Sequence, residues 1–340
     1  MPTRTILIVF LIMIITSACG QPVAPTLDPN TAMTQAFATV NAASTQTALA
    51  VPTYTPTATP YPTVITTPII PGLIQRNITY CENTVPLEMD VYFPTAGSGP
   101  SPVLIYIHGG AWMIGDKAVG FQLEEIPTIA AAGYFIASID YRLAPDYPFP
   151  AMIEDAKCAV RFLRAHAQEL NINPDKIGVL GVSAGGHIAS LLGLADEIAG
   201  WETGQYLEQS SRVQAVVDLW GPSDFTDPTF AEKLQKRGYQ LFPNVSPDQN
   251  MLASASPITY VSADDPPFLI VHGDQDAVVP PSQSQALYDS LIAVGVPAFL
   301  QMVTNAGHNL VSAGGPISPT RKQVTEIYIQ FLDYFLKGAQ

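Results

Sequence analysis

Residues 73–340 predict an α/β domain in which a mostly parallel central sheet is covered by helices on both faces. The first observation is a series of continuous apolar segments of strand length, rich in β-branched residues, which are typical of fully buried strands. The second is that segments with helical spacing of apolar residues lie between them. Strands that alternate with helices favour parallel pairing, and a chain of this length can form one large domain.

The predicted elements begin with an antiparallel hairpin at 78–94. Parallel strands are expected at 103–109, 134–141, 176–183, 213–220 and 267–273, with a weaker strand near Ala298–Val303. Helices are expected over 151–168, from about Ala184, from about Ser282, and over about 320–336.

Residues 221–262 fit this alternation poorly. They contain several Pro, Asp and Ser residues and few long apolar runs. We expect an insertion that covers the sheet as a cap or lid.

The N-terminal residues 1–19 have the layout of a secretory signal peptide. Arg4 precedes a ten-residue apolar run at 6–15, and small residues follow up to Cys19. The apolar run is too short for a convincing transmembrane helix. The segment resembles a bacterial lipoprotein signal, in which the cysteine becomes the lipidated first residue, although Thr16 replaces the commoner leucine.

This signal predicts an exported protein anchored to the membrane through a lipid on Cys19. A plain signal peptide, and hence a secreted protein, or an uncleaved anchor are the alternatives. Residues 20–72 are rich in Thr, Pro and Ala, so we expect an extended, disordered tether between the anchor and the domain.

The charge of the chain excludes one class of partner. Only Arg4 and Asp28 are charged before residue 73, so the domain carries the whole formal net charge of −14. Sequence-independent binding of nucleic acid needs a basic face, so we expect no nucleic-acid partner. Three cysteines exclude a disulfide-rich scaffold and a four-cysteine zinc site.

The strongest chemical signal is the segment GVSAGG at 181–186, which directly follows a predicted strand and precedes a predicted helix. This is the G-x-S-x-G pattern in the context that it requires. The tight turn exposes the hydroxyl group of Ser183. Ala184 begins the helix behind it, and the backbone N–H groups at a helix start can stabilise a developing anion. We therefore expect Ser183 to be a nucleophile.

A serine nucleophile needs a base, which follows it in the chain order of this motif. Of the three later histidines, His308 lies in a glycine-containing loop after the last predicted strand, where such sheets place catalytic groups. His187 lies one turn beyond Ser183 on the same helix, and His272 ends a strand, so we expect structural roles for both. His308 is thus the expected base.

The acid that orients the base is expected in the segment VHGDQDAVVP at 271–280. Asp274 and Asp276 both follow the strand end. We favour Asp276, which lies deeper in the loop, and interpret Asp274 as a turn residue.

The donors that stabilise an oxyanion are expected in HGGAW at 108–112, directly after the strand 103–109. Glycines at this place allow the backbone to approach a substrate closely. The N–H of Ala184 supplies a second arm of this site.

These motifs together resemble the α/β-hydrolase superfamily, specifically its lipase and esterase branch near the hormone-sensitive-lipase-like esterases. The HGGxW form also resembles bacterial BD-FAE-type feruloyl/acetyl esterases and kynurenine formamidases. The resemblance covers about 73–340 and rests on five ordered motifs: HGGAW at 108–112, DYRLAP at 140–145, GVSAGG at 181–186, HGDQD at 272–276 and GH at 307–308.

The resemblance implies the α/β-hydrolase fold and a catalytic triad of Ser183, Asp276 and His308. It also implies that the oxyanion donors are the N–H groups of Gly110, Ala111 and Ala184. Because Ala111 stands where the hormone-sensitive-lipase-like group has a third glycine, Gly109 remains an alternative donor. Arg142 and the carboxylates at 154–155 match positions that suggest an internal ion pair.

The implied activity is hydrolysis of a small carboxylic ester through an acyl-enzyme, without a metal or organic cofactor. A peptidase or amidase of the same fold, including a formamidase, is the alternative, and a surface-binding protein without activity is a third. Two alternatives remain for Cys81 and Cys158: they form a disulfide, or they are two buried thiols. Four aromatic residues are candidates either for the pocket wall or for core packing: Trp112, Tyr141, Trp201 and Trp220.

Overall fold

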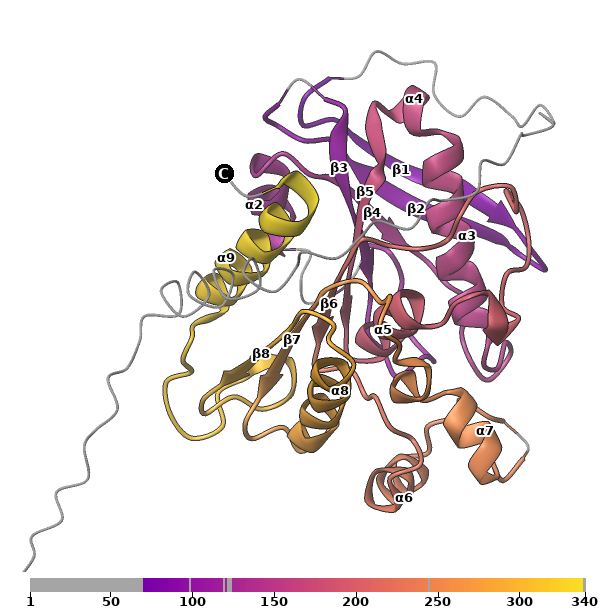
Figure 1. The fold of residues 1–340 in the computed structure, drawn as a ribbon, viewed down its shortest axis with the longest axis vertical. Helices are drawn as coiled ribbons and strands as arrows, with labels where there is room; N and C mark the ends of the chain where they lie inside the picture. The colour runs from indigo at the N-terminus through magenta and orange to yellow at the C-terminus, as the bar shows by residue number, and fades with distance from the viewer. Residues whose placement is uncertain (1–69, 98, 119, 121–123, 244, 339–340) are drawn as a thin grey trace, which may run out of the picture.

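The computed structural model describes residues 70–338 apart from 98, 119, 121–123 and 244 (Figure 1). The predicted signal peptide, the predicted lipid site at Cys19 and nearly all of the predicted tether lie outside these residues.

The fold is built on one eight-stranded sheet with the strand order β1-β2-β4-β3-β5-β6-β7-β8. β1 and β2 form the predicted antiparallel hairpin, β2 is also antiparallel to β4, and every other neighbouring pair is parallel. Every predicted strand is present. The strands are β1 (Ile74–Glu82), β2 (Pro86–Tyr92), β3 (Ser101–Ile107), β4 (Phe135–Ile139), β5 (Ile172–Val182), β6 (Ala215–Leu219), β7 (Phe268–Gly273) and β8 (Ala298–Val303).

Helices cover both faces of the sheet, as the continuous apolar strands predict (Figure 1). In β3, Val103, Ile105 and Ile107 belong to the buried cluster on one face of the sheet, whereas Leu104 and Tyr106 belong to the cluster on the other face. The helices are α2 (Ile126–Ala131), α3 (Ala151–Ala165), α4 (Ala167–Leu170), α5 (Ala184–Leu194), α8 (Pro281–Ala293) and α9 (Arg321–Leu332). Among the described residues, no helix is both long enough and apolar enough to cross a membrane.

Residues 221–262, which we call the cap segment, connect β6 to β7. They form α6 (Pro228–Lys236), α7 (Gln249–Ser254) and a short 3-10 turn at Pro257–Tyr260. The aspartates that interrupt the apolar pattern cap these helices: the carboxylates of Asp227 and Asp248 accept hydrogen bonds from backbone N–H groups in the first turn of α6 and α7. Both helices lie at one end of the molecule, beyond α5 and α8 (Figure 1).

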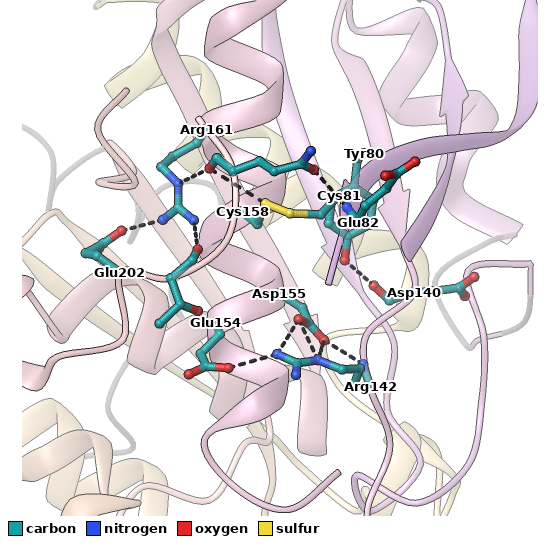
Figure 2. Close-up of a disulfide and its surroundings, with 12 residues drawn as sticks. Tyr80, Cys81, Glu82, Asp140, Arg142, Glu154, Asp155, Cys158, Arg161 and Glu202 are labelled. Carbon is teal, nitrogen blue, oxygen red and sulfur yellow. Dashed lines mark hydrogen bonds and ion pairs between the residues drawn. A yellow bond between two sulfur atoms is a disulfide. The ribbon is translucent and has the colours of Figure 1, made fainter. Parts of the chain in front are cut away.

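The hairpin is tied to the body of the domain by a disulfide between Cys81 of β1 and Cys158 of α3 (Figure 2). The structure thus settles the pairing that the sequence left open. Beside it, the hydroxyl group of Tyr80 donates a hydrogen bond of 2.6 Å to the carbonyl oxygen of Asp140.

Arg142 forms the predicted internal ion pair (Figure 2). Its guanidinium lies 2.8 Å from carboxylate oxygens of both Glu154 and Asp155. The Asp155 carboxylate is fully buried and also accepts the backbone N–H of Arg142 at 2.8 Å, so its charge is matched inside the protein. This network anchors the loop after β4 to α3.

Candidate active site

Ser183 occupies a sharp turn between β5 and α5. Its φ and ψ angles are 55° and −116°, a region that residues other than glycine rarely adopt. The backbone N–H of Ser183 donates to the carbonyl oxygen of Leu219 at 2.9 Å, and its own carbonyl accepts the N–H of His187 at 3.0 Å. These bonds from β6 and α5 hold the strained turn, which is the geometry of a nucleophile elbow.

The small residues around Ser183 are required by close backbone contacts. A Cβ atom on Gly181 would collide with the carbonyl oxygen of Gly185, and one on Gly185 would collide with the carbonyl oxygen of Ile107. The elbow therefore packs directly against the end of β3, where the HGGAW loop begins.

Three side chains from distant parts of the sequence meet at this elbow. The hydroxyl oxygen of Ser183 lies 3.0 Å from Nε2 of His308, and Nδ1 of His308 lies 2.7 Å from Oδ2 of Asp276. Ser183 follows β5, Asp276 follows β7 and His308 follows β8, so all three stand at the carboxyl edge of the sheet. The structure thus brings together the three residues that the sequence singled out.

The Asp276 carboxylate is fully buried and held from several sides. Its Oδ1 accepts the backbone N–H groups of Val278 and Val279 at 2.7 and 3.0 Å. Burial alone would raise the pKa of Asp276, but hydrogen bonds from His272 and His308 and their charges outweigh burial and hold that pKa well below its ordinary value. Asp276 therefore stays ionised and orients the His308 ring with its Nδ1–H toward the carboxylate.

His272 contributes more to the site than the sequence indicated. We expected it to support the backbone at the end of β7, and its Nε2 does lie 3.0 Å from the carbonyl oxygen of Val279. The same nitrogen lies 3.4 Å from Oδ2 of Asp276, and Nδ1 lies 2.6 Å from the hydroxyl group of Ser284. His272 is fully buried and thus positions both the Asp276 carboxylate and its loop. Its place four residues before Asp276 was the available sequence signal.

Asp274 lies in the turn after β7, as we expected, but its side chain bonds to a distant loop instead of its own turn. Its Oδ1 accepts the backbone N–H of Ala306 at 3.3 Å, which joins the loop after β7 to the loop that carries His308. The carboxylate that contacts the His308 ring is that of Asp276.

The HGGAW loop lies against the elbow in an unusual backbone conformation. Gly110, Ala111 and Trp112 have φ angles of 124°, 53° and 63°, all in the region that favours glycine. A Cβ atom on Gly109 would stand 2.9 Å from the carbonyl oxygen of Val182, so the loop needs glycine to approach β5. Two adjacent non-glycine residues in this conformation indicate that the surrounding packing holds the loop in place.

The predicted oxyanion residues border the same cavity as Ser183 and His308. Gly109, Gly110, Ala111 and Ala184 all line it. Ala184 is the first residue of α5, and the first N–H groups of a helix have no partner within it, so its N–H is available to an anion beside Ser183. The backbone on two sides of Ser183 can therefore stabilise negative charge.

This catalytic cavity has a volume of about 650 Å³ and is mainly apolar. The cap segment closes one side of it with Phe230, Leu234 and Tyr239, and the loop after β7 closes another with Val278 and Val279. Of the residues lining it that the structure describes, only His308 is of the Asp, Glu, Lys, Arg or His type. The cavity therefore suits a neutral, apolar group.

Of the four candidate aromatic residues, Trp112 lines the cavity. Tyr141 is buried and donates through its hydroxyl group to the carbonyl oxygen of His108 at 3.0 Å. Trp201 packs edge-on against Phe149, and Trp220 is fully buried in the core.

The comparison with protein families decides the identity of this domain. The BD-FAE family profile matches residues 89–291, more than half of the chain. The chain belongs to the BD-FAE family. The matched region contains the elbow and Asp276, and the structure adds His308 from the loop after β8, beyond the end of the match.

Two curated relatives of this BD-FAE protein are named as ester hydrolases. Esterase LipC and the probable carboxylic ester hydrolase LipM, both of Mycobacterium tuberculosis, are 34% and 36% identical to it over 202 and 200 residues, in each case 57% of this chain. The matches span 49% and 46% of those proteins, so the chain covers about half the length of these curated relatives.

A solved structure confirms the α/β-hydrolase fold of the BD-FAE domain. A truncated carbohydrate esterase from gut microbiota is 27% identical, with a TM-score of 0.68, and the match covers 78% of this chain and 96% of that one.

In the described part of the chain, no group of three or more His, Cys, Asp and Glu residues could hold a metal ion.

Proposed function

We propose that this protein is a serine carboxylesterase that hydrolyses neutral carboxylic esters through an acyl-enzyme. The observation that carries the proposal is the continuous contact from the Ser183 hydroxyl through His308 to Asp276, at the wall of an apolar cavity. Membership of the BD-FAE family and the esterase names of the relatives support the same reaction class.

In the first half of the reaction, the Ser183 oxygen attacks the ester carbonyl carbon while Nε2 of His308 takes its proton. The carbonyl oxygen becomes an oxyanion, which the N–H groups of Gly110, Ala111 and Ala184 stabilise. The imidazolium of His308 is stabilised by the ionised Asp276. His308 then donates its proton to the leaving alcohol oxygen, and the bond from this oxygen to the acyl carbon breaks.

In the second half, a water molecule attacks the acyl carbon and gives its proton to His308. The bond between the acyl group and Ser183 breaks, and His308 returns the proton to the Ser183 oxygen. The products are one alcohol and one carboxylic acid, and no group in this cycle needs a metal or organic cofactor.

The first test is hydrolysis of p-nitrophenyl esters, from acetate to dodecanoate, by the full chain and by Ser183→Ala. We expect Ser183→Ala to lower kcat by at least about 10⁴-fold. Ser282→Ala, at an exposed serine of α8, is the matched control and should retain activity. A fluorophosphonate reagent should modify Ser183 and leave Ser183→Ala unmodified.

If wild type hydrolyses no ester although its circular dichroism spectrum shows that it is folded, the carboxylesterase proposal would be rejected. Release of amine from anilides under the same conditions would then support the amidase alternative. If no serine-directed reagent labels the protein, this result would instead support a binding protein without activity.

We also propose that the protein is exported and anchored to a membrane through a lipid on Cys19. The apolar run at 6–15 and the small residues before Cys19 support this proposal. Labelling with a fatty acid and fractionation of cells that express the full chain test it. Wild type should carry label in the membrane fraction and Cys19→Ala should not, whereas unlabelled wild type in the medium would indicate secretion.

A further inference from the structure

A second cavity lies within the cap segment, next to the catalytic cavity. It has a volume of about 470 Å³ and is lined by residues of α6, α7 and the loop between them, including Ala231, Phe242 and Leu252. Its lining is more apolar than polar. Glu232 is the one charged residue among its described lining residues, and it is paired with Lys236 at 2.6 Å on the exposed side of α6. Such a space suits an apolar chain rather than an ion.

The two cavities share a wall. Trp112, Leu234 and Tyr239 line both of them. The rings of Trp112 and Tyr239 meet edge to face with their centres 6.3 Å apart. Leu234 and Tyr239, at the end of α6, are only partly buried although both are large apolar side chains. These two side chains therefore separate the catalytic cavity from the space behind it.

The wall is built on a lightly anchored helix. Phe230 is the only buried residue among the nine of α6. The helix ends at Lys236. Gly238, with a φ of 70°, then turns the chain so that the backbone N–H of Tyr239 donates to the carbonyl oxygen of Leu234 at 3.3 Å. This terminal turn and the ring contact of Tyr239 with Trp112 help to hold the two side chains against the core.

The reaction decides which part of an ester would face this wall. The leaving alcohol oxygen must lie beside Nε2 of His308, because it takes its proton there. His308, Val278 and Val279 line the catalytic cavity and none of them lines the second cavity. The acyl substituent points away from the leaving oxygen and thus away from His308. It therefore extends toward the wall formed by Trp112, Leu234 and Tyr239.

We propose that the second cavity is the binding site for the distal part of a long, apolar acyl chain, and that Leu234 and Tyr239 determine acyl-chain specificity. The inference rests on the proposed carboxylesterase function. It assigns the carbonyl end of a medium or long aliphatic acyl group to the catalytic cavity and its distal part to the second cavity.

The test compares kcat/KM for p-nitrophenyl acetate and p-nitrophenyl decanoate in the full chain. Ala231→Phe, which fills the second cavity, should lower the decanoate-to-acetate ratio at least about tenfold. Tyr239→Ala and Leu234→Ala, which open the wall, should raise the ratio by about three- to tenfold. Lys236→Phe places the same new side chain on the exposed side of α6, and its ratio should match that of wild type.

Opposite shifts in the filled and opened variants cannot arise from loss of fold, and labelling of Ser183 by a fluorophosphonate reports the folded fraction of each variant. A ratio that is unchanged in both Ala231→Phe and Tyr239→Ala, while wild type hydrolyses esters, would overturn the inference and leave the proposed function intact. A wild-type protein that hydrolyses no ester would overturn both.

Discussion

The indole N–H of Trp112 donates a hydrogen bond of 3.0 Å to Nδ1 of His187. On its other side, Nε2 of His187 donates to the carbonyl oxygen of Ala255 at 2.7 Å. One buried imidazole therefore joins the HGGAW loop, the helix behind Ser183 and the cap segment. Because an indole nitrogen only donates, Nδ1 must be the acceptor, and this arrangement requires neutral His187.

Protonation of His187 should therefore oppose folding. Burial lowers its pKa from 6.5 to about 4, although the hydrogen bond to Ala255 acts in the other direction. Between these two pH values the unfolded chain binds a proton that the native protein excludes, so stability is lost as the pH falls below 6.5. We expect this residue alone to remove about 2 kcal/mol of unfolding free energy between pH 7 and pH 5.

The measurement is urea unfolding of wild type and His187→Gln at both pH values. The advantage of wild type over the variant should shrink by about 2 kcal/mol at pH 5. The comparison is needed because buried Asp218, whose pKa burial raises to about 6, acts in the opposite direction and is present in both proteins. An advantage that does not change with pH would show that His187 is not the titrating group.

Asp276→Asn should retain the fold but lose activity. The amide oxygen can still accept the N–H groups of Val278 and Val279, whereas the negative charge that orients and stabilises protonated His308 is removed. We expect kcat for p-nitrophenyl acetate to fall by about 10⁴-fold. Asp274→Asn is the matched control, because that carboxylate contacts a backbone N–H rather than His308, and an equal loss in both variants would contradict the assignment.

Gly185 and Gly307 are both part of the sequence motifs, but only Gly185 should be irreplaceable. Gly185→Ala would place a Cβ against the carbonyl oxygens of Ile107 and His108, so we expect a loss of about 3 kcal/mol or more. Gly307 has a φ of −88°, and a Cβ there meets no atom closer than 3.6 Å. Gly307→Ala should thus leave stability unchanged or raise it by up to about 1 kcal/mol.

Thermal unfolding of the two glycine variants beside wild type makes this measurement. Equal melting temperatures for Gly185→Ala and Gly307→Ala would show that the elbow does not contact the end of β3 as closely as described.

Loss of the disulfide should destabilise the domain strongly. The bond joins Cys81 to Cys158 across 77 residues, which restricts the unfolded chain and corresponds to about 4 kcal/mol in the chain-entropy description. We expect the double variant Cys81→Ala/Cys158→Ala to melt about 10 °C below wild type.

Reductant supplies the control for the disulfide. It should lower the melting temperature of wild type toward that of the double variant, and it should not change the double variant. A wild-type melting temperature that reductant leaves unchanged would mean that the two thiols are not paired.

Local features of this chain were predictable because their causes are local. Continuous β-branched segments predicted the strands, and Gly181, Ser183 and Gly185 predicted the elbow because few residues tolerate that turn. The helix expected over 151–168 instead ends at Ala165, where His166 leaves the helical conformation and the single turn α4 follows. Helix ends depend on such single dihedral angles, which the apolar spacing does not reveal.

The contacts of buried polar side chains were less predictable. The sequence assigned structural roles to His187 and His272 but did not reveal that one holds Trp112 and the other lies beside Asp276. It also left Cys81 and Cys158 open, because nothing along the chain shows that β1 lies against α3.

The sequence by itself determined the order of strands and helices, the strained turn at Ser183 and the choice of Asp276 and His308, since these depend on residue type, spacing and chain order. The tertiary structure decided the contact between Ser183 and His308 across 125 residues, the disulfide, and the wall that Leu234 and Tyr239 form between two cavities. The physical reason is that local preferences act over a few residues. Distances between segments far apart in sequence are set only when the packed core closes the loops between them.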